Sequence, residues 1–466
     1  MQKIYFYITT PLYAASAKPL LGHACAALAA DIMARHKRAR QIPVFFQTGT
    51  DEHGAEIENK AGENGMPPQS WCDSGAGELR TLWKLLNISP DHFIRTTGGT
   101  HEAAAQAAFE KLIASGDIYP GKPGGRQDRS REEPYFFRLS KYEKNLLAHY
   151  AANPLFLAPG RAARETAGLT GSGLEDLPVS RTATAWGIKV PSNPAHAIAP
   201  WFGALMGYAT GPGYDPGKAS DSFQMKWPAD IQLAGRDALR LHAVVWPALL
   251  MALGLKPPKM IFVHGDWTVD GKKISGTEAA ADLLPDLVRE YGADALRYFL
   301  FREVPFGADG IFSRAALIRR YDADLAGGLG DLFSKVLGMV QKYLGDRLPD
   351  KPENAELFEE LSSLGPEINA KIDAMRFSEA LDGIWRAVGS LNKKIDRKKP
   401  WELAEMEPVE LKLFLHDLVW CLRVIAGWIY PFMPDTATRM QLGLAVGRTA
   451  AGGFDIQKPH PLFPRK

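Results

Sequence analysis

The chain has 466 residues, enough for two to four globular domains, and 46% of them are hydrophobic. Its formal net charge of +2 at pH 7 excludes an overall polyanion-binding surface, so any contact with nucleic acid must come from a local patch. The three cysteines, Cys25, Cys72 and Cys421, form no CxxC pair, which argues against a disulfide framework or a zinc knuckle and is typical of a reducing cytoplasm.

The N-terminal segment resembles an export signal only superficially. Lys3 precedes an aromatic stretch, but Thr9-Thr10-Pro11 interrupts it and a strand-turn-helix pattern continues. The longest apolar run, residues 243–255, contains a proline and is too short to cross a bilayer. We therefore expect a cytoplasmic protein without a membrane partner.

The first hundred residues alternate between strand and helix patterns. The expected elements are a strand at 3–9, a helix at 22–39, a buried strand at 43–46, a helix at 69–86, a strand at 93–95 and a helix from His101. This alternation predicts an α/β fold with a doubly wound parallel sheet.

The pattern changes twice further along the chain. Residues 116–195 are rich in glycine, proline and charge, which indicates an inserted subdomain. Strand-helix alternation resumes at 198–201 and continues to about residue 265. After about 326 the periodicity is helical as far as Leu444, which predicts a separate helical bundle.

The segment Lys18-Pro19-Leu20-Leu21-Gly22-His23 opens the first helix directly after the first strand. A helix N-terminus offers free N–H groups to phosphates, and a glycine there lets a base or sugar approach the backbone. On its own, this Gly-His pair fits a tight turn with a satisfied histidine better than a nucleotide site.

A second segment, Gly271-Lys272-Lys273-Ile274-Ser275-Gly276-Thr277, is a small basic loop. Phosphate transfer needs mobile cations that neutralise the charge on a leaving pyrophosphate. Taken alone, a lysine pair of this kind is more often a solvated turn.

Several polar groups follow the second strand, in Thr48-Gly49-Thr50-Asp51-Glu52-His53-Gly54. We expect this stretch to be a loop at the carboxyl end of the strand, where open α/β sheets bind ligands. Asp51 could there meet a substrate ammonium. Helix capping by Thr50 or Asp51 explains the same pattern equally well.

Two stretches, 201–208 and 235–242, and the following Trp246-Pro247 place aromatic rings and a histidine near further strand ends. By residue type alone, such clusters usually belong to the core.

The first and second segments resemble the HIGH and KMSKS signatures of class I aminoacyl-tRNA synthetases. Taken in order with the other stretches, they resemble the methionyl-tRNA synthetase family over essentially the whole chain. The further supporting stretches are 45–54, 135–142, 176–182, 291–298, 302–307, 399–401 and 431–434.

The resemblance implies a Rossmann catalytic domain divided by a connective insertion, then a stem-contact region and an all-α anticodon-binding domain. The corresponding boundaries are 1–115 and 196–257 for the Rossmann halves, 116–195 for the insertion, 258–325 for the stem-contact region and 326–466 for the helical domain.

The resemblance also implies a two-step reaction. An amino-acid carboxylate attacks the α-phosphate of ATP with Mg²⁺ and forms an aminoacyl-adenylate, and a terminal ribose hydroxyl of tRNA then takes the acyl group. Methionine is the default amino acid, and we expect a monomer.

Site residues follow from the positions that match the family. Asp51 would bind the ammonium, Arg181 would hold that carboxylate, and Asp237 would bind the ribose. The catalytic set is His23, Lys272, Lys273 and Ser275. The ATP-binding set is Gly22, His23, Asp237 and Lys273. The amino-acid pocket is Pro11, Tyr13, Asp51, Arg181, Trp201, Ala204, Tyr208, Ala238, Leu241, His242 and Trp246.

The basic stretch 392–399 precedes Pro400-Trp401, where relatives meet the anticodon. Asn392, Arg397 and Trp401 would then bind tRNA, with the indole stacked on a base. A solvated helix face with Trp401 packed into the bundle fits the same residues equally well.

The chain departs from the family pattern at several positions. Leu20 replaces the first histidine of HIGH, and Gly276 replaces the second lysine of KMSKS. Residues 121–128 hold no thiol where relatives carry zinc ligands, so we predict no zinc. Leu241, Ala238 and Gly203 stand where a phenylalanine, a larger aliphatic residue and an aspartate are usual, and residues 331–335 replace an Asn-Leu-x-Asn-Arg pattern.

Three functions stay open at this point. The first is a methionine–tRNA ligase with a divergent site. The second is a paralogue that passes an activated amino acid to a small hydroxylamine or amine. The third is a non-catalytic regulatory binding protein that retains the fold.

Overall fold

The computed structural model describes residues 2–16, 18–121, 134–182, 185–218, 220–271, 278–345, 347–348, 356–444, 446–448, 454–455 and 461–465. They form two compact units. The first runs to Asp266 and takes in α10 (Glu278–Tyr291) as far as Leu284, whereas the second holds Trp267 and continues from Pro285. Within the described ranges, none of the helices combines the length and apolarity that a bilayer crossing requires.

The first unit is built on a parallel sheet of six strands in the order β3-β2-β1-β11-β12-β6. Its strands are β1 (Phe6–Ala14), β2 (Val44–Asp51), β3 (His92–Arg95), β6 (Leu157–Ala158), β11 (Ile231–Gly235) and β12 (Ile261–His264). The strand order reverses between β1 and β11, which is the position where open α/β sheets bind ligands. The predicted doubly wound parallel sheet is confirmed.

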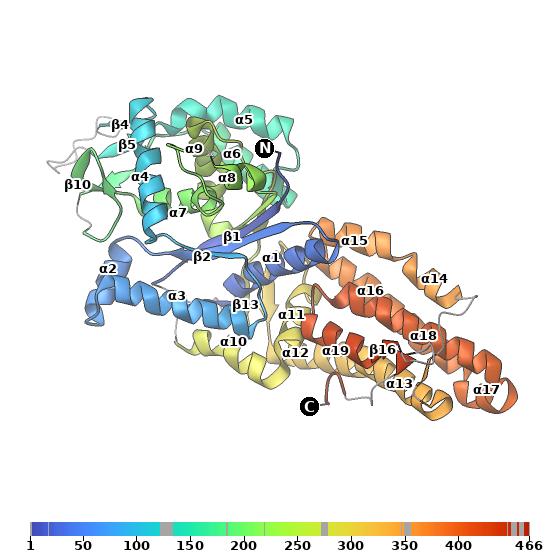
Figure 1. Ribbon diagram of the computed structural model, residues 1–466. Helices are drawn as coiled ribbons and strands as arrows, with labels where there is room; N and C mark the ends of the chain where they lie inside the picture. Colours follow the sequence, from blue (N-terminus) through green and yellow to red (C-terminus); the bar gives the residue numbers. More distant parts are fainter. Residues whose placement is uncertain are drawn as a thin grey trace. The chain divides into compact units, whose positions relative to one another are not determined.

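Helices connect and cover these strands. They are α1 (Leu21–Ala39), α2 (Ala55–Glu63), α3 (Pro68–Leu85), α4 (Gly99–Ala114), α5 (Glu143–Ala152), α6 (Gly160–Gly171), α7 (Pro200–Thr210), α8 (Asp221–Lys226) and α9 (Trp246–Leu253). Alanine and leucine favour helix in α1, and Lys37 and Arg38 in its last turn complement the negative end of the helix dipole. This helix packs against β1 and β2 (Figure 1).

Two small antiparallel sheets accompany the parallel one. One contains β4 (Ile118–Pro120), β5 (Tyr135–Phe137) and β7 (Leu177–Pro178), and the other contains β8 (Ser180–Arg181), β10 (Asn193–Ile198) and β9 (Lys189–Val190). The strand expected to resume the parallel alternation is therefore antiparallel β10. The strand β6, which lies inside the stretch 116–195, instead pairs with β12 at the edge of the parallel sheet.

The strand ends differ from expectation because both β1 and β2 run further. β1 continues through Pro11 to Ala14, and its register with β2 shifts between Thr9 and Leu12, since proline has no N–H for the ladder. β2 continues to Asp51, so residues 48–51 are strand rather than loop. The N-cap of α2 is Gly54, at φ 117°, so neither Thr50 nor Asp51 caps that helix.

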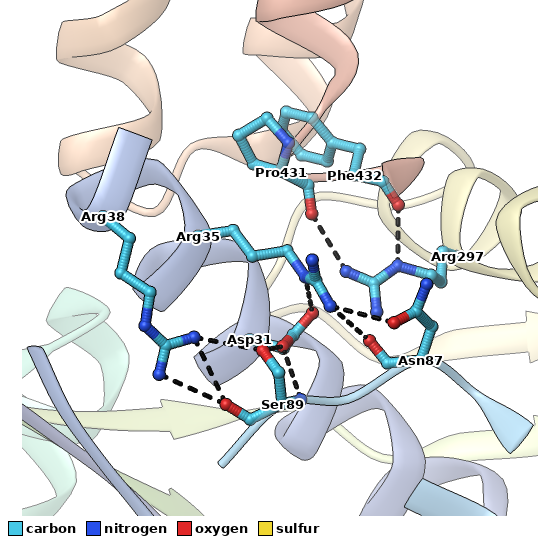
Figure 2. A network of polar contacts seen from close by, with 8 residues as sticks. All are labelled: Asp31, Arg35, Arg38, Asn87, Ser89, Arg297, Pro431 and Phe432. Carbon is cyan, nitrogen blue, oxygen red and sulfur yellow. Dashed lines mark hydrogen bonds and ion pairs between the residues drawn. The ribbon is translucent and has the colours of Figure 1, made fainter. Parts of the chain in front are cut away.

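A buried ion pair within α1 also forms hydrogen bonds to the segment before β3 and so fixes the helix to that segment (Figure 2). Asp31 accepts hydrogen bonds from Arg35 Nε at 2.7 Å and from the backbone N–H and hydroxyl of Ser89 at 2.9 and 2.8 Å. Arg35 also donates to the carbonyl and side-chain oxygens of Asn87, at 2.8 and 3.0 Å. These bonds satisfy both buried charges and set the position of the helix whose N-terminus carries Gly22 and His23.

The second unit is mainly helical. Its helices are α11 (Ala293–Arg302), α12 (Arg314–Arg320), α13 (Asp331–Leu344), α14 (Glu356–Ser362), α15 (Gly365–Asp373), α16 (Phe377–Lys398), α17 (Pro400–Met406), α18 (Pro408–Ile429) and α19 (Pro434–Leu444). Its strands are β13 (Trp267–Val269), β14 (Gly310–Phe312), β15 (Arg347–Leu348), β16 (Val446–Arg448) and β17 (Phe454–Asp455).

A fully buried arginine joins two parts of this second unit. Arg297 in α11 donates to the carbonyl oxygens of Phe432 and Pro431, at 2.7 and 2.9 Å, in the turn between α18 and α19 (Figure 2). These bonds give two carbonyls of the turn a partner and fix α11 to it.

Candidate active site

Four adjacent strands end in polar or small residues at one edge of the parallel sheet. They are β2 at Asp51, β1 at Ala14, β11 at Gly235 and β12 at His264. Because the strands are parallel neighbours, their carboxyl ends meet on the same side. The residues that follow them are therefore brought together although they are up to 250 positions apart in the chain.

The first turn of α1 holds His23 in a defined orientation. The Leu20 N–H donates to His23 Nδ1 at 3.1 Å, and the Tyr13 hydroxyl donates to the His23 carbonyl at 3.1 Å. A ring nitrogen that accepts carries no proton, so the neutral imidazole has its proton on Nε2. Burial and the nearby His264 lower the pKa of His23, whereas Asp237 opposes this. His23 is therefore a neutral donor at physiological pH.

Gly22, also in this turn, faces open space. A Cβ atom built on Gly22 would meet no protein atom within 4 Å. The fold itself therefore does not require glycine at this position. A glycine here instead leaves room for a ligand at the helix N-terminus, which is a functional reason for its presence.

Asp237 and His264 meet above the end of β11. Asp237 lies in the short 3₁₀ turn Arg236–Ala238, and its Oδ1 accepts the Ala238 N–H at 3.0 Å. A Cβ on Gly235 would lie 2.6 Å from Asp237 Oδ1, so a side chain there would displace that carboxylate, whereas His264 Nε2, at 3.7 Å, would stay in ordinary contact. Burial lowers the pKa of His264, and the charge of Asp237 opposes this.

Asp51 lies at the end of β2 in a poorly solvated place. Burial raises its pKa to about 6, against the opposing effects of His53 and Thr96. The Thr96 hydroxyl is 3.5 Å from its Oδ1. Burial and the charge of Asp51 both raise the pKa of Tyr208, so the two residues are within electrostatic reach. A carboxylate that is costly to ionise becomes stable when a substrate ammonium pairs with it.

A hydrogen-bonded chain runs from β1 to His242. The Leu12 N–H donates to the Tyr208 hydroxyl at 3.3 Å, and this hydroxyl donates to His242 Nε2 at 3.0 Å. His242 Nδ1 in turn donates to the Ala238 carbonyl at 3.0 Å. In this chain every donor has an acceptor only if the His242 imidazole is neutral, with its proton on Nδ1. Burial lowers the pKa of His242, which favours this neutral form.

The remaining predicted pocket residues lie on α7 and at the start of α9. Trp201, Ala204 and Tyr208 share one face of α7 because they are spaced at i, i+3 and i+7. Trp246 is fully buried, donates to Gln232 Oε1 at 3.0 Å, and has its ring 6.0 Å from that of Tyr208. The half-buried Ala238 and Leu241 flank His242, which lies in a π-helical turn, Leu241–Val245.

Not every predicted residue joins this group. Pro11 is half-buried within β1, beside the register shift. Arg181 is exposed at the end of β8, and among the described residues no ion pair joins it to Asp51. Lys272, Lys273, Ser275 and Gly276 lie outside the described residues, as does most of the segment 121–128 on which the zinc prediction depends.

The predicted tRNA-binding residues belong to the second unit. Asn392 is half-buried in α16 and donates to the Val388 carbonyl at 3.3 Å. Arg397 is exposed at the end of α16, and Trp401 in α17 is 52% exposed. The indole is therefore accessible and not packed inside the bundle.

Sequence reasoning missed two members of the site. Leu12 contributes its backbone N–H to the chain that ends at His242, which only the fold can reveal. His264 ends the apolar strand β12, and the same signal that marked Asp51, a polar residue directly after an apolar run, marks it in the sequence. No group of three or more potential metal ligands occurs in the part of the chain that the structure describes.

Comparison with known proteins gives a consistent result. The model of the family "tRNA synthetases class I (M)" matches residues 6–125 and 123–337. The methionine–tRNA ligase of Caldanaerobacter subterraneus subsp. tengcongensis is 41% identical over 99% of this chain and 78% of its own length. That of Bacillus subtilis is 38% identical over the same shares. The Mycobacterium tuberculosis methionyl-tRNA synthetase in complex with methionyl-adenylate superposes with a TM-score of 0.90, 35% identity and full coverage of both chains.

Proposed function

Because the chain belongs to the methionyl-tRNA synthetases of class I, we propose that it is a methionine–tRNA ligase that activates methionine with ATP. The observation that carries this proposal is the full-length similarity to a methionyl-tRNA synthetase structure in complex with methionyl-adenylate. The carboxyl edge of the sheet supports it, since His23, Asp51, Asp237 and His242 gather there.

In the first step, a carboxylate oxygen of methionine attacks the α-phosphorus of ATP. The new oxygen–phosphorus bond replaces the bond to the β-phosphate oxygen, and pyrophosphate leaves with that electron pair. Asp51 binds the substrate ammonium and thereby fixes the distance of the carboxylate from the phosphate. His23, a neutral donor through Nε2, binds the nucleotide beside Gly22, and Asp237 binds the ribose hydroxyls.

In the second step, a hydroxyl of the terminal ribose of tRNA attacks the acyl carbon and the bond from that carbon to the phosphate oxygen breaks. AMP leaves with this electron pair, and its phosphate takes the hydroxyl proton. The pocket built from Tyr13, Trp201, Ala204, Tyr208 and His242 binds the thioether side chain. Sulfur–aromatic contacts contribute roughly 0.3–1.5 kcal/mol each, so aromatic walls suit methionine.

Mg²⁺ enters this scheme with the nucleotide. Magnesium is usually held by substrate phosphates and water plus one or two carboxylates, and not by an all-protein cage. When bound, it neutralises charge on the phosphates. Lys272, Lys273 and Ser275 are proposed for the pyrophosphate side by their match to KMSKS.

We extend the proposal to a cytoplasmic monomer without zinc. The stretch 116–195 contains no cysteine, so it offers no thiolate ligands. Elemental analysis of the purified protein tests for zinc, and light scattering tests the oligomeric state.

The deciding experiment has two stages. ATP–pyrophosphate exchange, screened over twenty amino acids, should show methionine as the preferred substrate, and charging of tRNA should then follow with methionine. Exchange with methionine but no charged tRNA, under conditions where a control enzyme charges it, would favour a small acceptor. No exchange with any amino acid would contradict the proposal.

A further inference from the structure

Thr96 lies directly after β3, and its side chain is fully buried beside the candidate active site. Its backbone N–H donates to the Thr50 carbonyl at 3.2 Å, which continues the pairing of β3 with β2 by one residue. A buried hydroxyl needs partners inside the protein because water does not reach it. No signature marks Thr96 in the sequence, and none of the steps proposed above uses it.

The Thr96 hydroxyl connects the backbone after β2 to the Asp51 carboxylate. Its oxygen accepts the Glu52 N–H at 2.8 Å, and it donates to Asp51 Oδ1 at 3.5 Å. A hydroxyl has one proton and an ionised carboxylate can only accept, so the bond from Glu52 leaves that proton available for Asp51. At 3.5 Å the contact is long, but hydrogen bonds at catalytic sites often tighten only when the substrate binds.

Glu52, the other buried carboxylate beside Thr96, has donors of its own. It accepts from Arg95 Nε at 2.7 Å and from the hydroxyls of Thr50 and Thr97. Glu52 therefore does not compete for the Thr96 hydroxyl. The same bonds hold Glu52 in place, and with it the backbone N–H that orients this hydroxyl.

Several groups around Asp51 affect its ionisation, in opposite directions. Burial raises the pKa of Asp51 to about 6, and the charge of Glu52 adds to this effect. The charge of His53, a backbone hydrogen bond from His53 and the Thr96 hydroxyl act against it. The other titratable groups within electrostatic reach are Tyr208 of α7 and Cys72 of α3. Thr96 is thus the side chain in this group that stabilises the ionised carboxylate by a hydrogen bond.

We propose that Thr96 is a positioning residue of the amino-acid site, whose hydroxyl orients the Asp51 carboxylate for the substrate ammonium and favours its ionised form. The inference rests on the proposed function and deepens it. A carboxylate without this bond is free to rotate, so the ammonium must order it on binding, which costs affinity. Arg181, which the resemblance assigns to hold Asp51, is exposed, whereas Thr96 is fixed in the core.

The test uses the full chain and two pairs of side chains at position 96 that differ in the hydroxyl. Thr96→Val replaces the hydroxyl at nearly constant shape, and Thr96→Ser and Thr96→Ala repeat the comparison without the methyl group. Thr166→Val in α6 is the matched control, because Thr166 is also fully buried and its hydroxyl has no partner among the described residues. Thermal unfolding establishes which variants are folded, and the serine–alanine pair decides if Thr96→Val is not.

Calorimetric titration with methionine, without ATP, measures affinity between pH 5 and 8. At pH 8, Thr96→Val should bind roughly 3- to 10-fold more weakly than wild type, and Thr96→Ala more weakly than Thr96→Ser by a similar factor, the effect of one hydrogen bond. In both variants without the hydroxyl, the fall in affinity should begin about half a pH unit higher or more, because a group that lowers the pKa of Asp51 is gone. Thr166→Val should match wild type in both respects.

A purely structural role would weaken binding without moving the pH dependence, so an unmoved pH dependence in Thr96→Val would overturn the proposal. A serine variant that binds as weakly as the alanine variant would also overturn it, because the methyl group and not the hydroxyl would then matter. In the Asp51→Asn background, removal of the Thr96 hydroxyl should have no further effect, and an undiminished effect there would contradict the coupling.

The proposed function is judged separately. If pyrophosphate exchange selects another amino acid, the titrations use that amino acid, and a hydroxyl effect then supports the role of Thr96 although methionine is not the substrate. Exchange with methionine together with identical titrations of all variants would leave the ligase function standing and remove Thr96 from it. A wild-type protein that binds no amino acid would overturn both.

Discussion

At Gly22, protein stability and ligand binding favour different residues. It is the second residue of α1, where alanine normally stabilises a helix, and its Cβ position meets no protein atom. A side chain here would project only into space that the nucleotide is expected to use. Stability and function should therefore respond in opposite directions to the same substitution.

Gly22→Ala is predicted to leave the free energy of unfolding unchanged or raise it by up to about 1 kcal/mol. The same change should raise the KM for ATP at least about tenfold, since one displaced contact of 1.4 kcal/mol or more has that effect. Thermal unfolding and pyrophosphate exchange measure the two quantities. An unchanged KM for ATP would show that no ligand approaches this turn.

Asp51 makes a prediction about pH. Its pKa of about 6 in the free protein reflects burial, and a bound ammonium favours the ionised form. Affinity for methionine should therefore be level above about pH 7 and fall as the pH drops through 6, approaching tenfold per unit. Tryptophan fluorescence titrations between pH 5 and 8 can measure this.

Asp51→Asn is the control for this prediction, because the amide keeps the shape but does not titrate. Its affinity should be low at every pH and should show no step near pH 6. A step of the same size in the variant would assign the titration to another group.

At the scale of elements, α7 carries a glycine, Gly203, close to a buried histidine of α4. His101 of α4 is buried, donates or accepts through Nδ1 with the Thr210 hydroxyl at 2.7 Å, and has no partner for Nε2 among the described residues. A Cβ on Gly203 would lie 4.0 Å from that Nε2. Gly203 is the position where the family resemblance leads us to expect an aspartate.

Gly203→Asp should therefore stabilise the protein more than Gly203→Ala does. Gly203→Ala gains about 0.5–1 kcal/mol from helix propensity and Gly203→Asp only about 0.1–0.3 kcal/mol, and both must displace the Ile188 methyl group 3.3 Å away. Only the aspartate can pair with His101, which should add about 1–3 kcal/mol and raise the pKa of that histidine above its present value of about 3. Chemical denaturation of both variants measures the difference, and equal stabilities would show that no pair forms.

The elements also show where sequence reasoning succeeds and where it fails. The strand-helix alternation predicted the parallel sheet because each element has its own periodicity. It failed at the ends of β1 and β2, where Thr9–Pro11 and Thr48–Asp51 look like turns. These polar residues remain in strand because the neighbouring strands supply their hydrogen bonds. Gly49 also lets Ile94 of β3 approach closely, since a Cβ at position 49 would lie 2.0 Å from the Ile94 carbonyl oxygen.

The site was predictable to a similar degree. Signature matches indicated His23, Asp237 and His242, but the proton positions on His23 and His242 come from Leu20, Tyr208 and Ala238, whose roles depend on distances in the fold. Other contacts near the site are equally long in sequence: the bond from Lys60 Nζ to the Ser16 carbonyl spans 44 positions, and no local pattern encodes that distance.

At the scale of the whole molecule, the two units are expected to serve different steps of one reaction. The residues proposed for adenylate formation, apart from the 272–277 loop, lie in the first unit, whereas Asn392, Arg397 and Trp401 lie in the second. In the proposed scheme, the activation step does not involve tRNA. A defect confined to the second unit should therefore affect charging and leave pyrophosphate exchange intact.

Trp401→Ala tests this division of labour. A base stacked on an indole contributes about 1–3 kcal/mol, so the KM for tRNA should rise roughly 5- to 150-fold while exchange with methionine stays within twofold. Met406→Ala, which removes a 77% exposed apolar side chain from the same helix, is the matched control and should change neither. Equal effects of the two substitutions would indicate a general disturbance of α17. A loss of exchange in Trp401→Ala would mean that the second unit takes part in the chemistry of activation, so that the two units do not act separately.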